Sequence, residues 1–235
     1  MALPIIDTPT YDLKLVSSGE TIKYRPFLVK EQKILLMSAE EGTPDAVMNG
    51  ITQILQNCTF GSVDISKLPV FEVENIFLRL REKSVGEIAE FSVACTSDEC
   101  KGTTQTKIDL RHLKIDETKI KSKTIELTSS LYVNMRYPTL VDLGVLKDLN
   151  SLDDNFKFLA SCIESIEYNG ELIDMSTTSR SELQEFIENL TQQQFELIKE
   201  FFADMPRMSG KLEYECSACG THCERELSGL QNFLA

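Results

Sequence analysis

Two pairs of cysteines constrain this chain more than any other feature of its sequence. Cys95 and Cys100 lie mid-chain with four residues between them, and Cys216 and Cys219 lie near the C-terminus with two residues between them. Each pair looks like half of a tetrahedral thiolate site, because one short cysteine loop supplies only two of the four ligands that Zn²⁺ requires. We therefore expect the fold to bring both pairs together on one ion, which would tie the middle of the chain to its end.

The predicted metal site has the character of a structural centre, because a catalytic zinc keeps one coordination position open. Gly220 supports the second half-site, since glycine adopts the positive φ that cysteine loops often need. Other readings stay open: buried thiols without metal, two separate weak sites, or iron on the same ligands. His222 or Cys223 could also replace Cys100 as the fourth ligand, although we expect both to lie just beyond the loop on the outgoing strand.

The composition is that of an ordinary soluble globular protein, with 42% hydrophobic and 26% charged residues. The formal net charge is −13 and no stretch is rich in Lys and Arg. Because binding a phosphate backbone needs clustered cations, nucleic acid is not an expected partner. The N-terminal residues have no basic segment followed by a long apolar run, which predicts no signal peptide and no membrane insertion. A reducing cytosolic compartment follows, where paired cysteines bind metal more often than they form disulfides.

Two segments of the sequence resemble each other, Tyr11–Pro26 and Lys123–Pro138. In both, polar and apolar residues alternate around a Ser-Ser pair, which is typical of a β-hairpin. The closing proline ends the strand because it cannot donate to a sheet ladder.

A helical period follows each proline. Thr43 and Pro44 can begin one helix, and Ser151 can cap another. The predicted apolar faces of these two helices are Val47, Ile51, Ile54, Leu55 and Cys58 in the first, and Leu152, Phe156, Leu159, Ile163 and Ile166, with Cys162 beside them, in the second. Later helices carry Val73, Ile76, Phe77 and Leu80 in one half, and Phe195, Ile198, Phe201 and Phe202 behind a Thr191–Gln194 capping box in the other, with a further helix over 179–190.

Both halves end in a glycine, a short strand, a cysteine loop and a returning strand. These segments are Gly86–Cys95 with Thr106–Leu110, and Gly210–Cys216 with Glu224–Leu227. We therefore predict an α+β fold made by internal duplication, with chance similarity as the alternative. The predicted lobes are 1–122 and 123–235, each a small antiparallel sheet with helices that ends in a zinc knuckle, paired about a pseudo-twofold axis.

Enzyme chemistry is not indicated. Nucleotide-binding glycine loops, the zinc-protease His-Glu-x-x-His motif and the Gly-x-Ser-x-Gly elbow are all missing from the sequence. Cys58 and Cys162 are interpreted as small buried apolar residues on their helices. His112 has no candidate catalytic partner nearby in the sequence, so no catalytic residue and no small-molecule substrate are predicted.

Three stretches of the sequence resemble a known family. They are Leu68–Glu87 running into Phe91–Cys95, the ending Tyr214–Gly220 with Leu227–Phe233, and the N-terminal Leu3–Pro4. Together they resemble the baseplate hub subunit family of T-even-like contractile-tailed bacteriophages, although Cys95 and Cys100 are spaced more widely than the expected Cys-x2-Cys.

The resemblance implies a virus-encoded factor of the tail baseplate, a structural subunit or an assembly helper for the hub. Its expected partners are other phage baseplate or hub proteins, and its expected location is the virion tail baseplate and, during assembly, the host cytoplasm. A soluble hub-assembly chaperone absent from the mature virion is the alternative, and a metallohydrolase is a third reading. Segments 32–58 and 179–202 are the expected contact regions.

Overall fold

The chain folds into two compact units, of which the computed structural model describes residues 7–120, 122–144, 151–175 and 178–228. Within these, 7–65, 71–116 and 207–228 form the first unit, and 66–70 with the described parts of 117–206 form the second. The chain thus leaves the first unit near residue 117, close to the predicted lobe boundary at 122, and returns at 207. The last part of the predicted lobe 123–235, including the second cysteine pair, belongs to the first unit.

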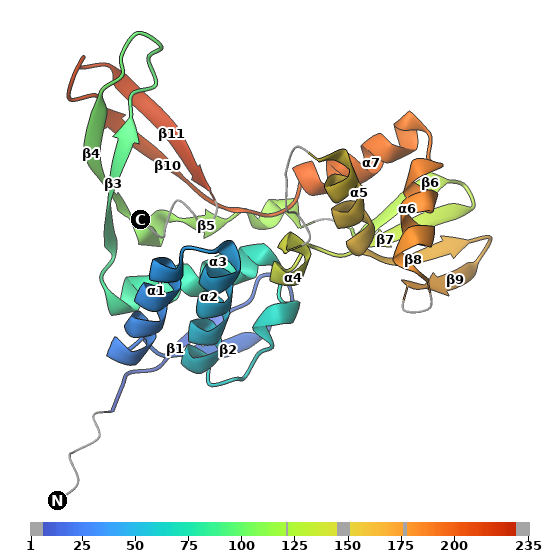
Figure 1. Ribbon diagram of the computed structural model, residues 1–235, viewed down its shortest axis with the longest axis horizontal. Helices are drawn as coiled ribbons and strands as arrows, with labels where there is room; N and C mark the ends of the chain where they lie inside the picture. Colours follow the sequence, from blue (N-terminus) through green and yellow to red (C-terminus); the bar gives the residue numbers. More distant parts are fainter. Residues whose placement is uncertain (1–6, 121, 145–150, 176–177, 229–235) are drawn as a thin grey trace, which may run out of the picture. The chain divides into compact units, whose positions relative to one another are not determined.

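The first unit combines three helices with short antiparallel sheets. Its strands pair in the orders β1-β2, β3-β4 and β11-β10-β5. The bounds are β1 (Tyr11–Lys14), β2 (Thr21–Tyr24), α1 (Val29–Glu41), α2 (Pro44–Cys58), α3 (Val70–Ser84), β3 (Ile88–Ala94), β4 (Thr103–Asp109), β5 (Lys114–Ile115), β10 (Met208–Glu215) and β11 (His222–Ser228), with a 3-10 turn at Leu110–His112. A further 3-10 turn, Ile65–Lys67, begins at the last residue before the segment 66–70 of the second unit. The β3–β4 and β10–β11 hairpins run side by side with their turns at the same end (Figure 1).

The second unit is a four-stranded antiparallel sheet, in the order β6-β7-β8-β9, packed against helices. Its bounds are β6 (Thr124–Thr128), β7 (Leu131–Met135), α4 (Leu140–Leu143), α5 (Leu152–Ser161), β8 (Ile163–Tyr168), β9 (Glu171–Asp174), α6 (Arg180–Glu188) and α7 (Gln192–Ala203), with a 3-10 turn at Glu117–Lys119. Val133 and Met135 from the sheet pack with Leu183 and Ile198 from the helices in one buried core. The two units together confirm the predicted α+β class.

The helix starts follow their capping residues, as the sequence predicted. The hydroxyl oxygens of Thr43, Ser151 and Thr191 accept the backbone N–H groups of Ala46, Asp154 and Gln194, at 3.2, 3.3 and 3.3 Å. Such a bond satisfies one of the N–H groups that the first turn of a helix leaves unpaired. Ser179 caps α6 in the same way. The helices predicted to begin at Thr43 and at Thr191, and the one predicted over 179–190, are therefore confirmed, the last with the bounds Arg180–Glu188.

One predicted helix is wrong in its second half. The helix capped by Ser151 ends at Ser161, and Ile163 and Ile166 lie in strand β8 instead of on the helix face. Residues three apart lie on one face of a helix but on opposite faces of a regular strand. Here the β7–β8 pairing shifts register between Asn134 and Met135, opposite Ser165 and Ile163, and both isoleucines lie in the same buried core. The turn Asn169–Gly170, with φ of 53° and 82°, then closes a β8–β9 hairpin. Leu152, the first residue of α5, was predicted to be buried and is 75% exposed.

The two similar hairpins are each followed by the same backbone anchor. After β2, the backbone N–H of Arg25 donates to the Cys58 carbonyl at 3.0 Å; after β7, that of Arg136 donates to the Cys162 carbonyl at 2.8 Å. Both cysteines are fully buried, which confirms their prediction as core residues, and burial raises the pKa of Cys58 to about 11 and of Cys162 to about 12. Both thiols are therefore protonated and act as apolar side chains.

The arginine of each anchor also pairs with an acidic residue at the start of the next helix. Arg25 contacts Glu31 at 3.0 Å, and Arg136 contacts Asp142 at 2.7 Å. Each carboxylate in turn accepts a backbone N–H from the residue that precedes its helix, at 2.8 Å. Hairpin, arginine, capping acid and cysteine-ended helix thus recur with the same bonds in both units.

The Arg136–Asp142 pair makes the stability of the second unit depend on pH. Burial opposes ionisation of Asp142, but hydrogen bonds from Arg136 and Thr139 outweigh it and lower the pKa to about 2, from an ordinary value of 3.8. A depressed pKa stabilises the fold above the unfolded-state value, and that contribution is lost as the pH falls through the folded-state value. We therefore expect the free energy of unfolding to decrease as the pH falls from about 4 to about 2.

Urea unfolding at several pH values, followed by circular dichroism, would measure this decline. An Asp142→Asn variant should be less stable at neutral pH, and its stability should approach that of the wild type as the pH falls through the same range. Effects of acid elsewhere in the chain are common to both proteins and cancel in the comparison. A constant difference between them at every pH would contradict the assignment to Asp142.

Candidate metal centre

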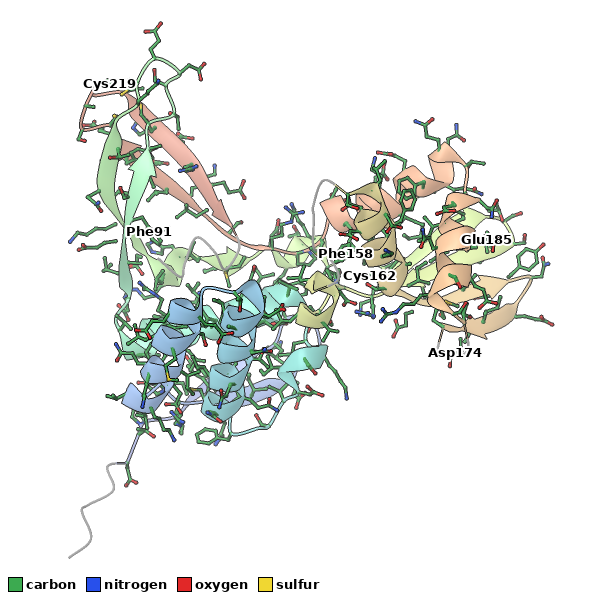
Figure 2. All side chains as sticks on the ribbon, in the orientation of Figure 1. Phe91, Phe158, Cys162, Asp174, Glu185 and Cys219 are labelled. Atoms are coloured by element: carbon green, nitrogen blue, oxygen red, sulfur yellow. The ribbon has the colours of Figure 1, made fainter. Side chains whose placement is uncertain are left out.

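The two cysteine pairs occupy equivalent turns of the two long hairpins. Cys95 follows β3 and its backbone N–H donates to the Gly102 carbonyl; Cys216 follows β10 and its N–H donates to the Thr221 carbonyl, both at 2.9 Å. In the second turn Gly220 has a φ of 72°, as its sequence position predicted. Cys219 is visible at the outer end of the hairpins in Figure 2. The structure therefore places both pairs at the same end of the hairpin pair.

Polar contacts hold the two turns together apart from the thiols. The Ser217 backbone N–H donates to the Thr104 hydroxyl at 2.9 Å, and the Ser217 hydroxyl donates to the Thr103 carbonyl at 3.1 Å. The Tyr214 hydroxyl also donates to the Ala94 carbonyl. These contacts were not predicted from the sequence; their one signal was the polar Ser and Thr residues near the cysteines.

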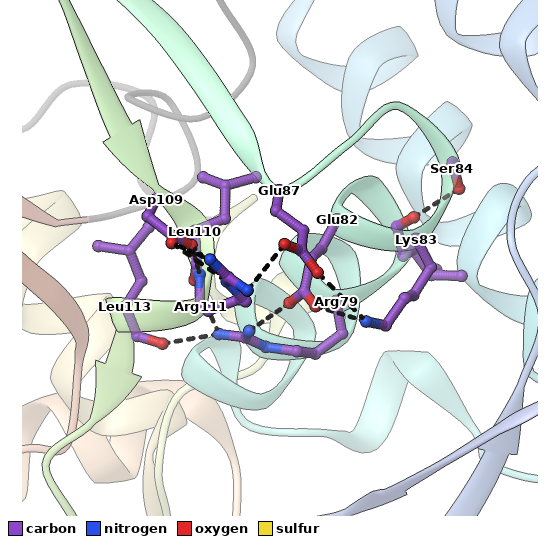
Figure 3. Close-up of polar contacts among 10 residues, drawn as sticks. Arg79, Glu82, Lys83, Ser84, Glu87, Asp109, Leu110, Arg111 and Leu113 are labelled. Atoms are coloured by element: carbon purple, nitrogen blue, oxygen red, sulfur yellow. Dashed lines mark hydrogen bonds and ion pairs between the residues drawn. The ribbon is translucent and has the colours of Figure 1, made fainter.

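The base of the β3–β4 hairpin is fixed to helix α3. The guanidinium of Arg79 donates to the carbonyls of Leu110 and Leu113 at 3.2 and 2.6 Å, and its other nitrogen pairs with Glu82 (Figure 3). Arg111, at the end of the hairpin, pairs with Glu87 at 2.9 Å. These bonds satisfy carbonyls at a chain turn and set the direction in which the hairpin leaves the helical part of the unit.

The four sulfur atoms converge as a tetrahedral metal site requires. The Sγ atoms of Cys95 and Cys219 lie 3.7 Å apart, those of Cys100 and Cys216 lie 3.8 Å apart, and all four lie within 4.8 Å of one another. Four sulfurs around a zinc with bonds of about 2.3 Å would be about 3.8 Å apart. A disulfide would need about 2.05 Å, and all four cysteines are free. The cluster can therefore hold a metal ion.

The pKa values of the cluster thiols also favour binding of a cation. Backbone N–H groups of Ala218 and Cys219 lower the pKa of Cys216 to about 6. At Cys95, the N–H of Ser97 favours the thiolate, but desolvation and the neighbouring sulfurs raise the pKa to about 12. The pKa is likewise lowered at Cys219, chiefly by the Thr221 hydroxyl and N–H, and raised at Cys100, so without a cation repulsion between the sulfurs opposes ionisation of all four. A bound divalent ion would remove this repulsion, because a coordinating thiol is deprotonated outright.

Cys223 and His222 lie on strand β11, as expected from the sequence. The Cys223 Sγ is fully buried, 3.9 Å from that of Cys95, and it donates to the Thr221 carbonyl at 3.5 Å. The His222 Nε2 faces the carboxylate of Glu224 at 3.8 Å. Among the residues that the structure describes, the four sulfurs that converge are those of Cys95, Cys100, Cys216 and Cys219.

Gly102 lets the two turns approach each other. A Cβ at this position would lie 2.5 Å from the Ala218 Cβ and 3.3 Å from the Cys100 Sγ. A Gly102→Ala variant is therefore expected to push the turns apart and to weaken metal binding about tenfold, since overpacking costs roughly 1–3 kcal/mol. Competition with a chromogenic chelator would measure the affinity.

The matched control removes the atom that collides. In a Gly102→Ala/Ala218→Gly double variant, most of the lost affinity should return, because the methyl group at position 218 is gone. Equal affinities in the wild type and the single variant would show that the turns do not meet at Gly102.

The comparison with known proteins covers almost the whole chain. Residues 8–235 match the model of a family described as T4 bacteriophage base plate protein. The chain belongs to this family. One relative, "Baseplate hub assembly protein gp26" of Enterobacteria phage T4, is 25% identical over 225 residues, which cover 95% of this chain and 97% of that protein. No solved structure matches.

Membership in the base plate family confirms the resemblance seen in the sequence and gives this chain a role in the tail baseplate or its assembly. Two of the stretches that carried the resemblance, Leu3–Pro4 and residues 229–233, lie outside the described residues. None of the helices in the described ranges is both long and apolar enough to cross a membrane.

Proposed function

We propose that this base plate protein acts without catalysis, by binding other baseplate components while the hub assembles. The observation that carries the proposal is the similarity, over nearly the full length of both chains, to a protein named for hub assembly. The acidic charge of −13 and the lack of catalytic motifs agree with a binding role. The expected setting is the host cytoplasm during assembly and then the tail baseplate of the virion.

A second candidate is a soluble assembly chaperone that leaves before the particle is complete. The word "assembly" in the name of the relative favours it. Both candidates bind baseplate proteins, and they differ in whether the chain stays in the finished particle.

The metal we propose is one structural zinc held by Cys95, Cys100, Cys216 and Cys219. Four thiolates close the coordination shell, so the ion would have no open position for a water or a substrate. Zinc bound there would cross-link the two hairpin turns. The chain would then present a rigid surface to its partners.

We also propose that the chain arose by duplication. The recurrence of hairpin, arginine, capping acid and cysteine-ended helix supports it, since Arg25 and Arg136 make the same backbone bond to Cys58 and Cys162. The paired cysteine turns, each closed by one cysteine N–H bond at 2.9 Å, support it as well.

Affinity capture of the tagged full chain from phage-infected cells, with mass spectrometry of the captured proteins, tests the binding role. Recovery of named baseplate proteins, in stoichiometric amounts and resistant to salt, is the expected result. Capture of no baseplate protein would overturn the proposal. Mass spectrometry of purified virions then separates a permanent subunit, which is present, from a chaperone, which is absent.

A further inference from the structure

The outer strand of the second unit's sheet is unusually exposed. All four residues of β9 are exposed, and among the strands that the structure describes no other has this pattern. Leu172 is 67% exposed and Ile173 is 43% exposed, on opposite faces of the sheet. Natural edge strands are commonly protected by lysine, proline, a bulge or a covering segment, because an open edge pairs with other chains. The two central residues of β9 carry none of the side chains that would protect it.

The backbone of Leu172 faces away from the sheet. The two-residue turn Asn169–Gly170 is closed by the pair Tyr168 and Glu171, and in such a hairpin this pair exchanges both hydrogen bonds. Because bonded and non-bonded pairs alternate in an antiparallel ladder, the next pair, Glu167 and Leu172, is not bonded across the hairpin. The N–H and C=O of Leu172 therefore point outward, where an added strand would need them.

The opposite edge of the same sheet is protected. Strand β6 changes register between Glu126 and Thr128, which interrupts a regular edge. The carbonyl of Leu127 at this point accepts a hydrogen bond from the Gln194 side chain at 3.4 Å. At β9, the Asp174 carbonyl accepts one from Thr178 at 3.4 Å, which limits any added strand to a short one beside Leu172. Strand β9 therefore can accept an added strand more easily than β6 can.

The charge around β9 indicates what would pair with it. Between Cys162 and Ser179 the sequence has four acidic residues and no Lys or Arg. These are Glu164, Glu167, Glu171 and Asp174, the last labelled at the end of β9 in Figure 2. A second copy of this chain would bring the same four carboxylates and a further net charge of −13, so self-pairing is disfavoured. A strand with Lys or Arg beside apolar residues fits both the charge and the exposed side chains.

We infer that β9 accepts a short extended segment of another baseplate protein as a fifth strand of this sheet. The segment would bond to the backbone of Leu172, place apolar side chains against Leu172 and Ile173, and place a cationic side chain near Glu171. This inference rests on the proposed function, because it names the surface through which the chain would bind its partner.

Site-specific photo-crosslinking tests the inference. The photoreactive amino acid p-benzoylphenylalanine replaces Leu172 in one variant and Thr128 on β6 in a matched control, both in the full chain in infected cells. We expect position 172, and not position 128, to crosslink to one segment of a baseplate protein that has Lys or Arg beside apolar residues. Mass spectrometry of the crosslinked peptides identifies that segment.

Charge variants supply an independent readout. Leu172→Lys and Glu171→Lys should each reduce recovery of that baseplate protein about tenfold, which corresponds to about 1.4 kcal/mol of binding free energy. Thr128→Lys should leave recovery unchanged. Unchanged circular dichroism spectra and melting temperatures would show that the variants fold.

Two results would overturn the inference while leaving the proposed function in place. One is recovery of the baseplate protein by both charge variants at the wild-type level. The other is a crosslink from position 172 only to a second copy of this chain or to no protein, while the wild type still captures its partner. If the wild type captures no baseplate protein, the proposed function itself fails.

Discussion

A Cys216→Ser variant is expected to lose all of the bound metal, and so is a Cys95→Ser variant. Each removes one ligand of a shared site whose four sulfurs lie within 4.8 Å of one another. Structural zinc contributes apparent binding free energies of about 10–16 kcal/mol, so losing one thiolate should also unfold the hairpin turns. Native mass spectrometry should find one ion per wild-type chain and none in either variant, with a lower melting temperature for both.

Cys223→Ser is the matched control. Cys223 is as buried as any residue of the cluster and lies 3.9 Å from the Cys95 sulfur, but it is not among the four converging sulfurs. The metal should therefore remain bound in this variant. Loss of half of the metal in each of the two ligand variants would instead indicate two separate sites. Metal analysis that found iron would keep the shared site and replace the proposed ion.

A Glu31→Leu variant is expected to lose about 3–5 kcal/mol of stability, because it leaves a buried guanidinium without its partner. The Glu31 side chain is completely buried and that of Arg25 is 9% exposed. The carboxylate also accepts the Leu28 backbone N–H at 2.8 Å, so the helix start would lose its cap. Since the whole free energy of unfolding of a domain is about 5–15 kcal/mol, the loss should be plain in a urea titration.

A double variant, Arg25→Met/Glu31→Leu, distinguishes the cost of an unpaired buried charge from the contribution of the ion pair itself. Replacing both charges with apolar residues should recover most of the lost stability, since it is the unpaired charge that is costly. The Glu90→Gln variant is the exposed control: its Lys107–Glu90 contact is 2.8 Å long but both side chains are 68% exposed, so no change is expected. Equal losses in the single and double variants would contradict the account.

The parts of the fold that were predictable depend on neighbours in the sequence. Thr43, Ser151, Ser179 and Thr191 mark helix starts because a capping hydroxyl bonds to an N–H only two or three residues away. The convergence of the cysteine pairs was predictable for a chemical reason, because neither pair alone can complete a metal site. That they bind one metal ion stays a prediction.

Other parts could not be read from periodicity alone. The spacing of Ile163 and Ile166 favours a helix, and the register shift in the β7–β8 pairing that accompanies their burial in a strand has no sequence signal. The Asn169–Gly170 turn that closes the hairpin was the local signal left unused. The close approach at Gly102 depends on Ala218, which is more than a hundred residues away in the sequence. The pairing of β10 with β5 is likewise long-range, so the return of the chain to the first unit at residue 207 has no local signal.

The interruption of the first unit by the second imposes an order on folding during synthesis. The turn with Cys95 and Cys100 leaves the ribosome first, but its partner turn is made only after residues 117–206, which are most of the second unit, have been translated. At about 5–20 residues per second, the interval between Cys100 and Cys216 lasts roughly 6–23 s. The second unit can fold within that interval, while the first remains incomplete and its early thiols stay unshielded. Closing of the cluster therefore follows translation of the second unit, and an ion bound there would mark a chain in which both hairpin turns have been made.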